Sequence, residues 1–112
     1  MIKPLRAHKN SSGPDGAPSG STLLISGQEL AMWFWQAFPD PSAEESRSYI
    51  SQDYEVTGYV IEGEAELHVD GKVITLTPGD SWVVPTGALH SYLILEPLTA
   101  IRTSHPPSSQ VY

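Results

Sequence analysis

The chain has 112 residues, including 10 Pro, 9 Gly, 4 His and no Cys, and its formal net charge is −7. The length favours a single domain, and the lack of Cys excludes disulfides, thiolate catalysis and Cys-ligated metal centres. The acidic balance argues against nucleic-acid binding, and no apolar run is long enough for a membrane-spanning helix, so we expect a cytoplasmic protein.

The beginning of the chain divides into an arm and a first pair of strands. Residues 1–21 are predicted to be a flexible arm, because Ser, Gly and Pro dominate its second half. Residues 22–112 are predicted to form one domain. Its first strands are Thr22–Ser26 and Ala31–Phe38, and both faces of Ala31–Phe38 are mostly apolar. Burial of both faces requires a second layer or a second subunit, so we expect a homodimer.

The middle of the chain is rich in β-forming residues and turn signals. Arg47–Glu62 is an extended stretch rich in Tyr, Val and Ile, and a break near Gln52-Asp53 or a bend at Gly58 is compatible with its sequence. Glu64–Asp70 alternates polar with apolar residues, which places His68 on an exposed face. Asp70-Gly71 is the residue pair typical of a type I′ hairpin turn, and Lys72–Leu76 is predicted as the returning strand.

The last third of the chain continues the same pattern of short strands. A Pro78-Gly79 turn precedes predicted strands at Ser81–Val84, His90–Leu95 and Leu98–Thr103. Eight or nine short strands without a convincing helix predict an antiparallel sandwich or barrel. Arg102 in the last strand is interpreted as a surface ion-pair partner, with contact to an anion as the alternative.

One segment carries a resemblance to a known family. Residues 79–90, GDSWVVPTGALH, are similar to the second motif of the cupin family, G-x5-P-x-G-x2-H-x3-N. The positions of this motif are filled by Gly79, Pro85, Gly87 and His90. Ile94 stands in the Asn position, and Gly63, which fifteen residues separate from Gly79, would close the first motif. The resemblance covers residues 31–103 and implies an all-β double-stranded β-helix, a jelly-roll barrel.

The strand period and the resemblance together indicate a binding site inside the barrel. Alternation puts His90, Tyr92 and Ile94 on one face, which the family pattern directs inward. The candidate pocket residues are His90, Tyr54, Gln52, Trp82 and Tyr92. Aromatic and polar side chains at the mouth of a barrel suit a small polar ligand, so we expect a sugar-like or carboxylate-like molecule to bind there.

The metal ligands of the family's first motif are missing. In metal-binding cupins this motif supplies two His and one Glu, and counting back from Gly63 puts the Glu position on Val56. The two His positions fall on Ile50 and Gln52, or on Tyr49 and Ser51 with the longer spacing of the motif. We therefore expect no cofactor and no metal in this site. If a divalent ion does bind, the candidate ligands are His90, Gln52 and Glu55.

Two other functions remain compatible with the sequence. The first is a metal-dependent lyase, isomerase or dioxygenase with atypical ligands. The second is a metal-free enzyme similar to sugar-epimerase cupins, in which His90 would act as base and Tyr54 as acid across the barrel. In each case the expected partners are a small molecule and a second copy of the chain, with neither nucleic acid nor membrane.

Overall fold

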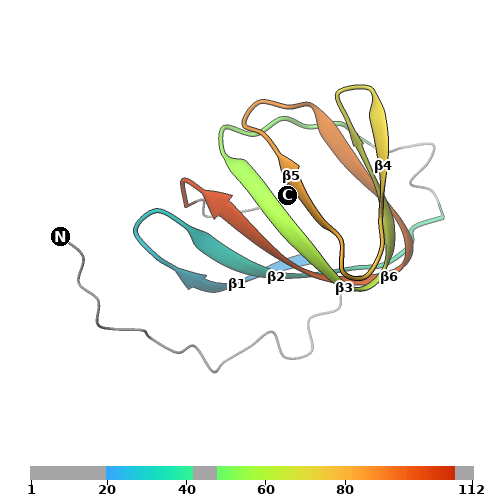
Figure 1. The fold of residues 1–112 in the computed structure, drawn as a ribbon, viewed down its shortest axis with the longest axis horizontal. Coiled ribbons are helices and arrows are strands. Elements are labelled where there is room, and N and C mark those ends of the chain that lie inside the picture. Colours follow the sequence, from blue (N-terminus) through green and yellow to red (C-terminus); the bar gives the residue numbers. More distant parts are fainter. Residues whose placement is uncertain (1–19, 42–47, 108–112) are drawn as a thin grey trace.

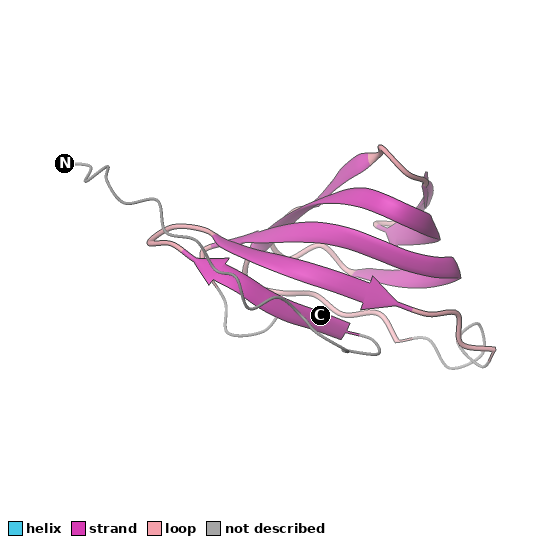
Figure 2. Cartoon of the chain, turned by 90° about the horizontal axis from the view of Figure 1, so that it is seen from below, coloured by secondary structure: helices cyan, strands magenta, loops and turns pink. Residues whose placement is uncertain are grey.

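The regular structure of the protein consists of β-strands. The computed structural model describes residues 20–41 and 48–107, and every regular element within these two ranges is a strand (Figure 2). The strands are β1 (Gly20–Ser26), β2 (Ala31–Ala37), β3 (Glu55–Val69), β4 (Lys72–Leu76), β5 (Ser81–Val84) and β6 (His90–His105). No helix that could cross a membrane occurs in the two described ranges. The predicted all-β class is confirmed.

The predicted arm lies mostly outside the described part of the chain. Residues 1–19 are not among the described residues, whereas Gly20 and Ser21 belong to β1. The first strand therefore begins two residues earlier than the sequence suggests. Its pairing partner is β2, with Ser21 opposite Trp35.

All six strands pair antiparallel in one curled sheet. The order is β1-β2-β6-β3-β4, and β5 also pairs with β3. The long strands β3 and β6 run side by side through both halves of the sheet (Figure 1). On its other edge, β3 pairs with β5 through residues 56–59 and with β4 through residues 65–69. Both halves of the sheet therefore contain β3 and β6.

From the sequence, two strands are expected where each of these long strands lies. Its predicted pairs are Arg47–Glu62 with Glu64–Asp70, and His90–Leu95 with Leu98–Thr103. In the structure β3 continues through Gly63, and β6 continues through Pro97. The ladder between them is irregular from Val60 to Ala65, which lets both strands bend without ending. The described residues therefore contain six strands instead of the eight or nine expected.

Gly63 is required at this irregularity. Its φ is 93°, and a Cβ built on it would overlap the carbonyl oxygen of Pro97. Any other residue would therefore push the two long strands apart where they bend. The predicted hairpin after β3 is also confirmed, because Asp70 and Gly71 have φ values of 49° and 78°, as a type I′ turn requires.

The core lies on the concave side of the sheet and contains all three tryptophans. Trp33, Trp35 and Trp82 are buried, and the Trp33 indole N–H donates a hydrogen bond to the Ser104 hydroxyl at 3.2 Å. The opposite face of β2 is different, because Met32 there is 40% exposed in the single chain. The second apolar face that the sequence expects to be buried is thus left open by the described residues of one chain.

Candidate functional site

The segment that resembles the second motif is held against residues 48–54. After β5, the chain turns at Pro85, and the Gly87 N–H donates to the Gln52 carbonyl at 2.8 Å. Ile50 and His90 then form an isolated antiparallel bridge, in which each backbone N–H donates to the other carbonyl at 2.9 Å. These backbone contacts bring Ile50 and Gln52 beside His90, although they are about forty positions away in the sequence.

His90 is buried with a defined hydrogen bond. It is 1% exposed, and its Nδ1 lies 3.0 Å from the carbonyl oxygen of Ala88. A carbonyl oxygen only accepts, so Nδ1 carries the hydrogen of this bond. In the neutral imidazole, Nε2 then keeps its lone pair and can accept a hydrogen bond or a proton.

Three aromatic rings form a cluster, and one of them, Tyr92, packs against His90. The Tyr92 ring lies 5.7 Å from the His90 ring and 4.8 Å from Trp35, measured between centroids. The Trp82 indole N–H donates to the Tyr92 hydroxyl at 3.0 Å. Burial raises the pKa of Tyr92 above its ordinary value of 10.0, against the opposing effects of Arg102 and Trp82. The Tyr92 phenol is therefore neutral at pH 7 and keeps its proton as a hydrogen-bond donor.

Arg102 lies inside this group, which corrects its interpretation as a surface residue. It is 1% exposed, and its guanidinium carbon stands 3.8 Å from the centroid of the Trp35 ring and 5.8 Å from that of Tyr92. Its Nη2 donates to the Ser21 hydroxyl. Burial lowers the pKa of Arg102 from its ordinary value of 12.5, while Tyr92 and Tyr54 act in the opposite direction.

The sequence did contain a signal for this position. Alternation from Leu98 through Ala100 predicts that Arg102 faces the same side as these apolar residues, and all three are buried. Sequence reasoning missed it because arginine is a residue type that is almost never fully buried. A guanidinium on an inward-facing strand position is therefore the functional candidate that the motifs did not reveal.

The other predicted pocket residues occupy two different sides of the sheet. Tyr54 is buried in the same core cluster as Trp35 and Trp82, and it opposes the lowering of the pKa of Arg102. Gln52 is half-buried beside the Gly87 turn. Glu55 alternates with the buried Tyr54 and Val56 and is exposed. The structure therefore gathers Tyr54, Trp82, Tyr92 and His90 inside but does not bring Glu55 to them.

The residues at the metal positions of the family's first motif do not fit a divalent ion. Val56, at the carboxylate position, is an apolar side chain of the core with 2% exposure. Ile50 offers only its backbone to His90, so one imidazole and the Gln52 amide remain as donors. No group of three or more His, Cys, Asp or Glu side chains that could hold a metal occurs in residues 20–41 and 48–107. A site with so few ligands binds transition metals poorly.

His68 does not belong to the site, and its predicted exposure is also corrected. It is half-buried, and its Nε2 lies 2.9 Å from a carboxylate oxygen of Glu66. Both residues alternate with the buried Ala65, Leu67 and Val69 of β3. They form a local pair on the outer side of the sheet.

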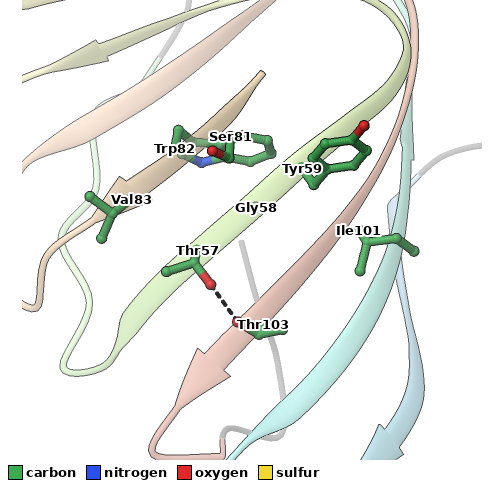
Figure 3. Close-up of a pocket in the computed structure, with 8 residues that line it drawn as sticks. All are labelled: Thr57, Gly58, Tyr59, Ser81, Trp82, Val83, Ile101 and Thr103. Atoms are coloured by element: carbon green, nitrogen blue, oxygen red, sulfur yellow. Dashed lines mark hydrogen bonds between the residues drawn. The ribbon is translucent and has the colours of Figure 1, made fainter. Parts of the chain in front are cut away.

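A groove of about 490 Å³ crosses the outer side of β3, β5 and β6 (Figure 3). Its lining consists of Thr57, Gly58, Tyr59, Ser81, Trp82, Val83, Ile101 and Thr103. The hydroxyl oxygens of Thr57 and Thr103 are hydrogen-bonded to each other at 2.5 Å (Figure 3). The Tyr59 phenol is the one ionisable group of this lining, so the groove offers no acid–base pair.

Comparison with known proteins agrees with the resemblance. A family model described as a cupin domain matches residues 40–101. The structure is similar to KdgF from Halomonas sp., with a TM-score of 0.70, 21% identity and 86% of each chain covered. It is also similar to an RmlC-like cupin from Shewanella frigidimarina, with a TM-score of 0.69, 21% identity, and 88% of this chain and 94% of the other covered.

A third similar structure is the EutQ protein of Clostridium difficile, with a TM-score of 0.66 and 18% identity over 83% of this chain and 68% of the other. Comparison with curated protein sequences gave no match. At these identities the structural likeness concerns the fold alone, a double-stranded β-helix. The chemistry of the site depends on the residues that this chain itself places there.

Proposed function

The chain belongs to the cupin family, and from this we propose that it binds a small polar molecule, sugar-like or carboxylate-like, inside its barrel without the metal of the family's first motif. The observation that carries the proposal is the group of inward-facing polar atoms within an aromatic surrounding. It comprises Nε2 of His90, the Tyr92 hydroxyl and the Arg102 guanidinium, beside the rings of Trp35 and Trp82.

These residues provide the interactions that a polar ligand with an apolar face needs. Trp35 and Trp82 supply ring surfaces, and their centroids lie 6.3 Å apart. His90 supplies an acceptor at Nε2, and Tyr92 supplies a hydroxyl donor. Tyr92 and Gln52 keep partial exposure, which marks the side from which a ligand would reach the interior. A few polar groups in an aromatic surrounding are typical of small-molecule sites.

Ligand screening on metal-free protein tests this proposal. We expect some sugars or organic acids to raise the melting temperature and to bind in calorimetry, and we expect His90→Gln to weaken the binding. His68→Gln is the matched control, because His68 lies on the outer side of the sheet. A panel without any hit, or equal losses in the two variants, would count against a site around His90.

Metal analysis tests the second half of the proposal. Protein purified without chelators should carry less than about a tenth of a divalent ion per chain, because one imidazole and one amide make a weak donor set. One ion per chain that is lost in His90→Gln would contradict it. It would favour the alternative of a metal-dependent enzyme with atypical ligands.

A second candidate function is acid–base catalysis without metal. It is favoured by the Ala88 carbonyl, which holds His90 in the tautomer whose Nε2 can act as a base. Tyr54 remains the proposed acid, and Tyr92 also stands beside the imidazole. The test is NMR in D2O with every compound that binds. A C–H signal that disappears with wild type and persists with His90→Gln supports catalysis, whereas unchanged spectra with both leave a binding protein.

We further propose that the protein is a homodimer. The outward face of β2 supports this, because Met32 is exposed in the single chain and so is Phe38, which directly follows the strand. Exposed apolar surface commonly marks an association site. A second copy covering this face would bury both side chains, and the oligomeric state in solution tests the idea.

A further inference from the structure

The outward face of the sheet around β6 carries two rows of uncharged side chains. In the first row, strand pairing sets Met32 of β2 beside Thr103 of β6. Thr57 of β3 and Val83 of β5 continue this row on one side, and Ile25 of β1 continues it on the other. In β2, β3, β5 and β6 these residues alternate with residues of the core. The row therefore points away from the interior site.

The second row crosses the same strands two positions further along. Pairing places Phe34 beside Ile101, and Ile101 beside Tyr59. Thr22 and Ser81 stand at the two ends of this row. Every side chain of both rows is either apolar or a hydroxyl, and none of the charged residues in ranges 20–41 and 48–107 stands in them. The two rows thus form one uncharged surface, which we call the β6 face.

Charged side chains lie around the β6 face. Glu55 is opposite His105 beside the first row, and Glu62 is opposite Thr99 beyond the second. An apolar centre with a charged rim is the usual composition of a protein–protein interface. We therefore examined which kind of partner the β6 face suits.

The charge of the chain favours a second copy as the partner. The formal net charge is −7, so two copies repel each other wherever their carboxylates approach. A two-fold symmetric dimer brings a patch against the same patch of the other copy, so a charge near the axis meets a like charge. The uncharged β6 face avoids this repulsion. A basic partner would instead be attracted to the carboxylates outside this face.

The shape of the β6 face is also suited to self-association. The groove of about 490 Å³ lies over β3, β5 and β6, whereas Met32 projects from β2, on the other side of β6 (Figure 3). A two-fold axis along β6 places β2 of one copy over β3 and β5 of the other. The hydroxyls of Thr57 and Thr103 in the groove are already hydrogen-bonded to each other, so covering them leaves this bond intact.

We propose that two copies of the chain pack their β6 faces together, and that Met32 of each copy fills the groove of the other beside Thr57 and Val83. The two sheets then lie face to face, as in a β-sandwich. This inference rests on the homodimer proposed above. It adds the surface, the position of the axis and the contact across it.

Two valines provide a matched pair of variants. Val83 lines the groove and is 47% exposed, whereas Val73 of β4 is 57% exposed and pairs with His68, outside the β6 face. Both lie on the surface of the single chain, so glutamate at either position should fold, and melting temperatures check this. Analytical ultracentrifugation of the full chain gives the dimer dissociation constant. We expect Val83→Glu to raise it about tenfold or more and Val73→Glu to leave it within about threefold of wild type.

Mixing two variants tests the contact across the axis. Met32→Lys should also weaken the dimer, because its charge enters the groove of the other copy. A mixture of Met32→Lys and Val83→Glu should form a heterodimer that is tighter than the homodimer of either variant, since the Lys and the Glu then meet. The two charges are on different chains, so no pairing within one chain can produce this gain. Met32→Lys mixed with Val73→Glu is the control, and its heterodimer should stay weaker than the wild-type dimer.

The outcomes separate this inference from the proposed function. A monomeric wild type, with the β6 face left to another protein or to a small ligand, would overturn both this inference and the homodimer, but not ligand binding inside the barrel. A dimer that Val83→Glu leaves intact, or that Val83→Glu and Val73→Glu weaken equally, would overturn the β6 face and leave a homodimer. Weakening by Val83→Glu without a tighter heterodimer would overturn the contact of Met32 with the groove. Weakening by Val83→Glu alone of the two valine variants, together with the heterodimer, supports the inference.

Discussion

Substitution of Gly58 tests the packing of Trp82, on which the proposed interior site depends. Gly58 pairs with Trp82 across the β3–β5 ladder, and the Trp82 indole occupies the space where a side chain at position 58 would begin. A Cβ built on Gly58 would lie 2.7 Å from Cε2 of Trp82 and closer still to two other ring atoms. Gly58→Ala therefore has to displace the indole. The indole also donates the hydrogen bond to Tyr92, so the substitution acts on the site as well as on the core.

The size of the effect follows from three contributions. Replacing glycine by alanine without a clash would stabilise the protein by about 0.4–1 kcal/mol, because the unfolded chain loses freedom. Forcing one extra carbon into a packed core costs about 1–3 kcal/mol. Loss of the hydrogen bond between Trp82 and Tyr92 adds about 1 kcal/mol. The balance is a destabilisation of about 1–3.6 kcal/mol, opposite in sign to an unhindered substitution.

Urea unfolding followed by tryptophan fluorescence measures this difference. A double-mutant cycle with Trp82→Leu isolates the contact, because the space above Gly58 is open once the indole is gone. In the Trp82→Leu background, Gly58→Ala should be neutral or stabilising. The reasoning is refuted if Gly58→Ala is as stable as wild type. It is also refuted if the substitution costs the same free energy in both backgrounds.

Three further predictions concern other parts of the molecule. The Thr77 N–H and hydroxyl donate to Oδ2 of Asp80 at 2.8 and 2.9 Å and lower the pKa of Asp80 below its ordinary value of 3.8. The melting temperature of wild type should therefore exceed that of Asp80→Asn above pH 3.8, and this difference should be lost as the pH falls through the lowered pKa; a constant difference would contradict it. Tyr92→Phe removes the acceptor of the buried Trp82 N–H, so its free energy of unfolding should fall by about 1–3 kcal/mol, whereas the exposed Tyr59→Phe should stay within about 0.5 kcal/mol of wild type. Equal values for the two variants would exclude a structural role for that hydrogen bond. Light scattering should give a dimer for wild type and a monomer for Met32→Glu, and a monomeric wild type would contradict the homodimer.

Most of the fold could be predicted because its signals are local. Alternation of polar and apolar residues marks Glu64–Asp70, and Asp70-Gly71 specifies its hairpin through backbone conformations that few residue pairs adopt. The spacing of Gly79, Gly87 and His90 identified the family, and the family model confirms it. The lengths of β3 and β6 were missed. Glycine and proline often end a strand, so the sequence predicts breaks at Gly63 and Pro97. Only the close approach of Gly63 to Pro97 across the irregular ladder shows that the two strands continue.

In the candidate site, too, some features follow from the local sequence and others only from long-range contacts. Sequence by itself determined the inward face shared by His90 and Tyr92, because a strand allows only two faces and the motif selects one of them. Only the tertiary structure decided that Arg102 lies buried beside Trp35 and Tyr92. Its guanidinium is oriented by Trp35 and by Ser21, which is 81 positions away in the chain. Contacts over such separations arise from strand pairing, and no local pattern records which strands become neighbours.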